Sequence, residues 1–207
     1  SPHRGAGTRN YIVVLGPTSR TASFVREVAR RLHPETTQYA NVDGVVAVAH
    51  TEGAGGERPN NLAFLMRALA GFLMHSNVGA ILLADDGAGG IRNDDLKRYL
   101  EDENLSYEDV PHRFMTLKGG FENCLKDAAG TILRWMSQLD EITREPLPVE
   151  YLKVALQCGG SDAFSGISGN PLAAWIAREI IRCGGSANLS ETPELFGAES
   201  YVLDNVR

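Results

Sequence analysis

The stretch YIVVLGPTSRTASFVREVARRL, residues 11–32, decides the fold class. It opens with the apolar, β-branched run YIVVL, a composition typical of a buried strand. A glycine and a proline then interrupt the run, and we expect a helix at 21–32, with Phe24, Val28 and Leu32 on one side. A buried strand followed at once by an amphipathic helix is the unit from which parallel α/β sheets are built.

The same alternation continues along the rest of the chain. We expect further strands at residues 44–49, 80–84, 113–117, 151–157 and 186–189, and further helices at 61–75, 94–101, 121–142 and 171–182. Continuous apolar strands separated by helices predict an α/β fold, a doubly wound, mostly parallel sheet of five to six strands with helices on both faces. We expect residues 1–207 to form a single α/β domain.

The composition narrows the functional classes. A formal net charge of -6 argues against a general nucleic-acid-binding protein, which usually carries a basic face. No apolar run approaches the roughly 20 residues that a membrane-spanning helix needs, and the first residues lack the apolar core of a signal peptide. Three widely spaced cysteines do not resemble a disulfide framework, so we expect a cytoplasmic protein without a membrane or nucleic-acid partner.

Four segments are expected at the carboxyl ends of the strands, where parallel sheets bind their ligands. They are residues 16–20, 50–56, 85–90 and 158–162, and the tetrapeptide GAGG occurs in the second and third of them, at 53–56 and 87–90. Glycines let a backbone approach a ligand closely, and a following helix N-terminus favours anions. The alternative interpretation is that tight strand-to-helix turns use glycine whatever the function.

Several side chains in these loops could carry chemistry. His50 could be a base or a ligand, or only a hydrogen-bonded turn residue. Cys158, which begins the segment CGGSD, could be a nucleophile or a metal ligand, or an inert buried thiol. Asp85 and Asp86 are adjacent carboxylates, for which two solvated side chains are the simpler interpretation. Glu191 is a candidate acid or base, or part of a polar loop.

A set of short motifs runs in order over nearly the whole chain. They are RNY at 9–11, NVDGVVA at 41–47, the His50 loop with its glycines, QCGGSD at 157–162, SGI at 165–167, NP at 170–171, GG at 184–185 and LSETPE at 189–194. In these motifs the chain resembles the altronate/galactarate dehydratase family. Members of that family are lyases that remove water from sugar acids such as altronate and galactarate, and related members cleave sulfolactate.

The resemblance implies a divalent metal, usually iron(II), which polarises the substrate carboxylate while a side chain removes the neighbouring proton. It implies that His50 or Glu191 acts as the base, that Asp162 orients a ligand or a water, and that Cys158 is a candidate metal ligand. Under the dehydratase hypothesis the residues expected at the substrate are Arg20, Gly53, Gly55, Gly159, Gly160 and Ser161.

The chain departs from the family pattern at three loop positions, where Arg20, Ala54 and Ala88 stand in place of cysteines. The joint loss of three thiols, with the glycines kept, indicates that a thiol-based metal site is gone while the loops persist. Arg20 adds a fixed positive charge whose two-pronged geometry suits a carboxylate. The other interpretation of Arg20 is a solvated arginine in the first turn of a helix.

Three hypotheses follow for the function. The first is a sugar-acid dehydratase, with a small-molecule sugar acid as its partner. The second is a non-catalytic relative that binds a small carboxylate without metal, and the third is a structural domain of a larger enzyme. Family members continue beyond LSETPE and often have a further N-terminal domain or a partner chain. We therefore expect a fragment or minimal version of a longer protein that is completed by a missing half or partner chain; a homo-oligomer is a further alternative.

Overall fold

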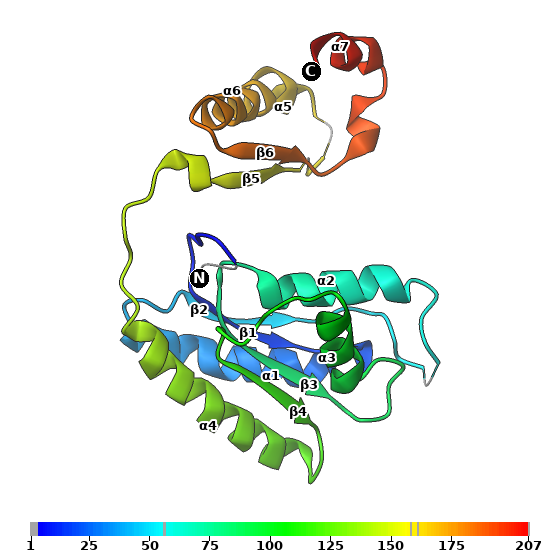
Figure 1. Cartoon of the computed structure of the whole chain (residues 1–207), viewed down its shortest axis with the longest axis vertical. Coiled ribbons are helices and arrows are strands. Elements are labelled where there is room, and N and C mark those ends of the chain that lie inside the picture. The colour runs from blue at the N-terminus through cyan, green and yellow to red at the C-terminus, as the bar shows by residue number, and fades with distance from the viewer. Residues whose placement is uncertain (1–3, 56, 158, 161, 207) are drawn as a thin grey trace. The chain divides into compact units, whose positions relative to one another are not determined.

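A computed structural model describes residues 4–55, 57–157, 159–160 and 162–206 of the chain (Figure 1). The chain was expected to form one domain over residues 1–207, but its contacts divide it into two compact units, Ser1–Arg144 and Glu145–Arg207. Within the described residues, no helix is both long enough and apolar enough to cross a membrane.

The first unit contains a sheet of four parallel strands in the order β2-β1-β3-β4. The strands are β1 (Tyr11–Leu15), β2 (Gly44–Val48), β3 (Val78–Asp85) and β4 (His112–Thr116). The helices that connect and follow them are α1 (Ala22–Leu32), α2 (Leu62–Met74), α3 (Asn93–Asp102) and α4 (Phe121–Asp140). The short 3₁₀ turns η1 (Ser19–Thr21) and η2 (His33–Gln38) flank α1. The predicted α/β class, with parallel strands and intervening helices, is confirmed.

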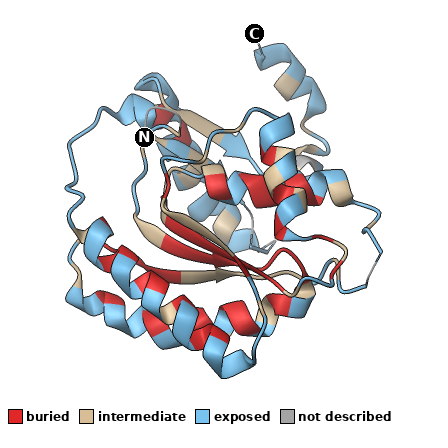
Figure 2. Cartoon of the chain, turned by 60° about the horizontal axis from the view of Figure 1, so that its bottom comes forward, coloured by how far each residue is buried: buried red, intermediate tan, exposed pale blue. Residues whose placement is uncertain are grey.

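Alternate residues of the central strand β1 face opposite layers of this unit. Ile12 and Val14 pack with α1 and α4, whereas Val13 and Leu15 pack with α2 and α3. Buried residues accordingly line the strands and the inner sides of the helices (Figure 2). Helices cover both faces of the sheet, and the carboxyl ends of its strands are left to the loops.

The second unit contains only two paired strands in its described residues. They are β5 (Lys153–Leu156) and β6 (Ser186–Leu189), which are parallel. The other elements are η3 (Val149–Tyr151), α5 (Ala163–Ile167), α6 (Gly169–Arg182), η4 (Thr192–Leu195) and α7 (Glu199–Asn205). Ala177 and Ile180 of α6 are its buried apolar residues among those described, whereas Phe164, Trp175 and Phe196 are exposed.

The six predicted strands therefore form sheets of four and two strands, which corrects the single sheet of five to six. The physical reason lies between β4 and β5. The long helix α4 ends at Asp140, and Pro146 and Pro148 follow in the connector. Proline lacks an amide hydrogen and disfavours a helical conformation of the residue before it, so a helix cannot run on through this stretch. A new unit begins beyond it.

Candidate functional site

Three loops of the first unit meet at the carboxyl ends of β1, β2 and β3. The Gly16 amide donates to the Val48 carbonyl at 3.0 Å, and the Ser19 amide donates to the Glu52 carbonyl at 2.8 Å. These bonds join the loop after β1 to the end of β2 and the loop that follows it. Since β1 lies between β2 and β3, the chain reverses its direction across the sheet here, where ligands bind in doubly wound folds. The prediction that four segments share one edge is confirmed for these three, whereas the segment expected at 158–162 follows β5, which belongs to the other sheet.

Arg20 connects all three loops. Its Nε donates to Asp86 Oδ2 in the loop after β3, and its Nη1 lies 3.4 Å from the Ala54 carbonyl in the loop after β2. The Arg20 side chain remains 45% exposed, so one side of the guanidinium faces solvent. Arg20 is therefore neither an unpaired group nor a fully solvated arginine. It is ion-paired with Asp86 and can still bind a further partner.

Asp86 is held firmly on the other side of this ion pair. Its Oδ1 accepts hydrogen bonds from the Ala88 amide at 3.1 Å and the Gly89 amide at 3.0 Å. Partial burial acts to raise the pKa of Asp86, but the hydrogen bonds from Arg20, Ala88 and Gly89 outweigh it and leave the pKa below its ordinary value. Asp86 is therefore a fixed anion that determines where the Arg20 guanidinium lies.

Two glycines at this edge are needed for packing between loops. A Cβ on Gly90 would overlap the carbonyl oxygen of Glu57, and a Cβ on Gly53 would lie 3.0 Å from the side chain of Thr18. Gly53 also has a φ of +73°, which few other residues adopt. A Cβ on Gly55 would lie no nearer than 3.8 Å to Glu57. The close packing of one loop against the next therefore explains why residues 53 and 90 are glycines. This agrees with the interpretation that such loops use glycine for structural reasons, whatever the function.

His50 lies at the start of the loop after β2. Its Nδ1 accepts a hydrogen bond from the Glu52 amide at 3.2 Å. In the neutral imidazole the proton is therefore on Nε2, which is buried and has no hydrogen-bond partner among the described residues. In this state the Nε2 atom of His50 can donate a hydrogen bond but cannot accept one.

Asp85 and Asp86 have different environments, although they are adjacent. Asp85 is buried, which corrects the expectation of two solvated carboxylates. Its Oδ2 accepts a hydrogen bond from the Asn93 amide at 2.8 Å, at the start of α3, and the Asn93 side chain donates to the Met115 carbonyl at 3.0 Å. Sequence reasoning missed Asn93 as a partner of Asp85. The signal available was a strand ending in an acid shortly before a helix N-terminus, where amides lack partners.

In the second unit, Asp162 accepts a hydrogen bond from the Ser165 amide at 2.8 Å and so caps α5. A Cβ built on Gly159 or Gly160 would meet nothing within 4 Å, so the backbone there is accessible. Glu191 immediately precedes η4 and is partly buried. Cys158 and Ser161 lie outside the described residues.

The two units match two successive family models. Residues 1–140 match the second domain of D-galactarate dehydratase/altronate hydrolase, and residues 149–207 match the C-terminal domain of D-galactarate/altronate dehydratase. The chain belongs to this dehydratase family. The boundary between the matches coincides with the connector between the units.

Three relatives show how much of a family protein is represented. The chain is 30% identical to the altronate dehydratase of Bacillus subtilis (strain 168), over 96% of this chain and 39% of the relative. It is 28% identical to the altronate dehydratase of Escherichia coli (strain K12), over 97% of this chain and 39% of the relative. It is 25% identical to the (2R)-sulfolactate sulfo-lyase subunit beta of Chromohalobacter salexigens, over 95% and 46%. The chain spans about two fifths of the two altronate dehydratases.

Where the three loops of the first unit meet, the described side chains do not fit an iron ion. Among described residues, no three His, Cys, Asp or Glu side chains are grouped so as to hold a metal. Where the three loops meet, the central side chain is the Arg20 cation, and Asp86 already uses both oxygens. A cation would be repelled by Arg20 and would find no thiolate at Ala54 or Ala88.

Proposed function

We propose that this chain is part of a carbon–oxygen lyase that removes water from a hydroxy acid of the altronate/galactarate type. The observation that carries the proposal is that both units match domains of this one family, in order. Two relatives that span the chain nearly end to end are altronate dehydratases. The loops that meet at the carboxyl edge of the first sheet support it, because they present a cation, suited to an anionic substrate, at the usual ligand-binding position.

In this proposal Arg20 binds the substrate carboxylate. Its Nε is bonded to Asp86, and no described residue pairs with its Nη2. A guanidinium held on one side by an aspartate can offer the other side to a second carboxylate through two parallel hydrogen bonds. Gly53 and Gly55 are proposed to let the backbone of the first unit approach the substrate. Gly159, Gly160 and Ser161 are the substrate-binding residues proposed in the second unit.

The proton transfers are assigned to His50, Glu191 and Asp162. Dehydration moves a proton from the carbon beside the carboxylate to a base, and the β-hydroxyl leaves with a second proton as water. Because neutral His50 carries its proton on Nε2, it can hold the leaving β-hydroxyl by a hydrogen bond, and the proton that completes the water then comes from solvent. Glu191, in the second unit, is the other candidate base, and Asp162 of that unit is the residue proposed to orient a ligand or a water. The resulting enol gives a 2-keto-3-deoxy acid.

A second candidate function is binding of a small carboxylate without metal and without turnover. It is favoured by the Arg20–Asp86 ion pair, which occupies the meeting point of the loops. Binding then needs only the guanidinium, and neither an iron ion nor Cys158 takes part. The two candidates share the ligand class and differ in the product.

We also propose that the dehydratase needs the rest of the family fold. The chain represents about two fifths of its altronate dehydratase relatives, and one relative is the beta subunit of a lyase. The remaining part would come from the same polypeptide or from a partner chain. A homo-oligomer stays a prediction.

The test is formation of 2-keto-3-deoxy acids from a panel of hexonates and aldarates, by the longest natural protein that contains this chain, with and without added iron(II). Iron-dependent turnover supports the dehydratase with a metal held elsewhere than at Arg20. Turnover in a chelator supports a metal-free lyase. Saturable binding of the same acids without product supports the second candidate, and neither binding nor product overturns both.

The role of Arg20 is tested in the same assay. Arg20→Ala should weaken acid binding by about 10-fold to 100-fold, since it removes a charge-assisted pair of hydrogen bonds. Arg98→Ala, which changes an exposed arginine of α3, is the matched control and should leave binding unchanged. Equal affinity in the Arg20→Ala variant and the wild type would exclude Arg20 as the carboxylate ligand.

A further inference from the structure

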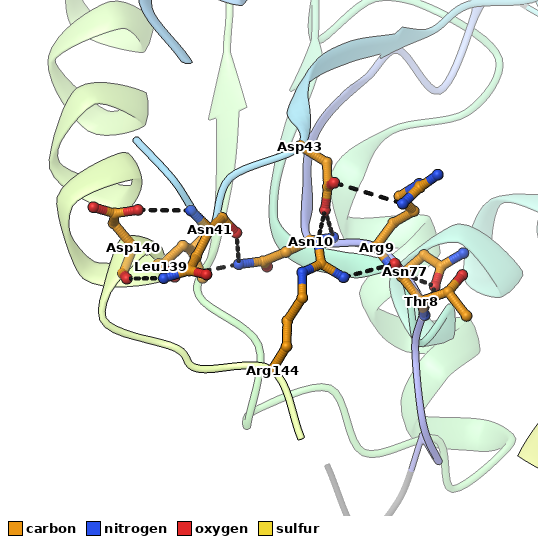
Figure 3. A network of polar contacts seen from close by, with 9 residues as sticks. All are labelled: Thr8, Arg9, Asn10, Asn41, Asp43, Asn77, Leu139, Asp140 and Arg144. Carbon is orange, nitrogen blue, oxygen red and sulfur yellow. Dashed lines mark hydrogen bonds and ion pairs between the residues drawn. The ribbon is translucent and has the colours of Figure 1, made fainter. Parts of the chain in front are cut away.

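The motifs RNY and NVDG have no role at the candidate site, because they lie at the other end of the first sheet. Asn10 precedes β1, Asp43 precedes β2, and Asn77 precedes β3, so all three lie at the amino ends of the strands. Together with Thr8, Arg9, Asn41, Leu139, Asp140 and Arg144 they form one set of polar contacts, which we call the Asp43 network (Figure 3).

The strand starts and the end of α4 are bonded to each other in this network. The Asn10 side chain donates to the carbonyls of Asn41 at 2.8 Å and Leu139 at 3.2 Å. Asn41 in turn donates its amide to the Asp140 carboxylate and its side chain to the Asp140 carbonyl, both at 2.8 Å. A Cβ on Gly79 would overlap the Asn10 side chain, so a glycine is required beside it. The end of α4 is therefore fixed against the sheet.

Arg144 attaches the beginning of the connector to the same network. Its Nη1 donates to the Thr8 carbonyl at 2.8 Å, and its Nη2 donates to Asp43 Oδ2 at 2.7 Å (Figure 3). Asp43 also accepts the Asn10 amide at 2.6 Å and lies 3.9 Å from Arg9. The Asp43 carboxylate is only 19% exposed, so it is a fixed acceptor and not a mobile surface group.

We propose that the Asp43 network is a clamp that determines where the connector between the two units becomes free. With Arg144 bound, the free stretch runs from 145 to the start of η3 at Val149. With Arg144 released, the free stretch begins after α4, at 141, and its length about doubles. The reach of the connector increases with the length of its free stretch, in which the two prolines favour extended backbone. This device is independent of the proposed activity.

Trypsin cleavage after Arg144 tests the clamp in the full chain, because the protease must take the Arg144 side chain into its own pocket. The reference is the peptide LDEITREPLPVE, residues 139–150, in which that arginine is unrestrained. Mass spectrometry should show cleavage at least about 10-fold slower in the protein than in the peptide, since proteolysis follows the population of the released state. Equal rates would overturn the proposal.

Two variants identify the bonds responsible. Asp43→Asn should speed cleavage after Arg144 by roughly threefold to 10-fold, because the charged acceptor is lost. Arg144→Lys keeps a trypsin site and the Asp43–Asn10 bond but cannot reach Thr8 and Asp43 together, so its cleavage, measured against the matching lysine peptide, should also be faster. Asp127→Asn, which frees Arg113 from a similar exposed pair, is the control and should leave cleavage at Arg144 unchanged. Unchanged protection in both test variants, with folding verified by circular dichroism, would overturn the clamp.

Discussion

Strands β3 and β5 each contain a run of apolar residues, but their burial differs greatly. Seven of the eight residues of β3 are buried, whereas none of the four residues of β5 is. The difference lies in the neighbours, since β3 has β1 and β4 on its two sides and helices over both faces, whereas in the described residues β5 pairs only with β6. A parallel strand is buried only when a sheet of several strands has both faces covered. The apolar pattern in the second unit therefore indicates surface that the described residues leave uncovered.

The sharpest test of this comparison uses the two tryptophans. Trp135 of α4 is 9% exposed in the first unit, and Trp175 of α6 is 54% exposed in the second. Trp135→Ala should lower the free energy of unfolding by about 3–5 kcal/mol, and Trp175→Ala should change it by less than about 0.5 kcal/mol. Urea unfolding of the 207-residue chain measures both. A large loss on Trp175→Ala would mean that this face is covered.

A second test compares glycines of the two units. Gly90→Ala should destabilise the first unit by about 2 kcal/mol or more, because the new Cβ meets the backbone of Glu57. Gly159→Ala should stay within about 0.5 kcal/mol, because the space around Gly159 is open. Thermal unfolding of both variants is the measurement. Similar melting temperatures for the two would contradict the close loop-to-loop approach at Gly90.

The smallest expected effect concerns the ion pair at the sheet edge. Asp86→Asn should cost up to about 1 kcal/mol at pH 7, since Arg20 is partly exposed and its ion pair is screened by solvent. The folded-state pKa of Asp86 is lowered, so this contribution is present above the unfolded pKa of about 3.9 and is lost as the pH falls through the folded value. Urea unfolding at pH 7 and at pH 3 should show a smaller difference between wild type and variant at pH 3 than at pH 7. A difference of the same size at both pH values would assign it to packing.

Local patterns predicted most elements of the first unit closely. The helix expected at 21–32 is observed at Ala22–Leu32, and the strand expected at 113–117 is observed at His112–Thr116. Periodicity predicts these elements because each has one apolar face against a layer that exists in the same unit. The division into two sheets was not predictable in this way, since strand sequences alone do not state which strands pair.

The candidate site was predictable in position but not in its contacts. The expectation of parallel strands, whose carboxyl ends share one edge, placed Arg20, His50 and the Asp86 loop together, as observed. The Arg20–Asp86 pair joins residues 66 positions apart, and no periodic pattern reports such a contact. Likewise, the proton position on His50 depends on one amide bond from Glu52 that only the folded loop reveals. Side-chain pairing across loops follows from the tertiary fold.

The two-stranded sheet of the second unit has a consequence for the behaviour of the chain at high concentration. In the described residues β5 and β6 pair only with each other, so each presents an outer row of backbone amides and carbonyls. Such unpaired edges are templates for the strands of other molecules, and charged side chains on an edge strand oppose this. Lys153 at the start of β5 is the charged residue on these two strands. With one charge on these strands, we expect their edges to be open to pairing with strands of other molecules.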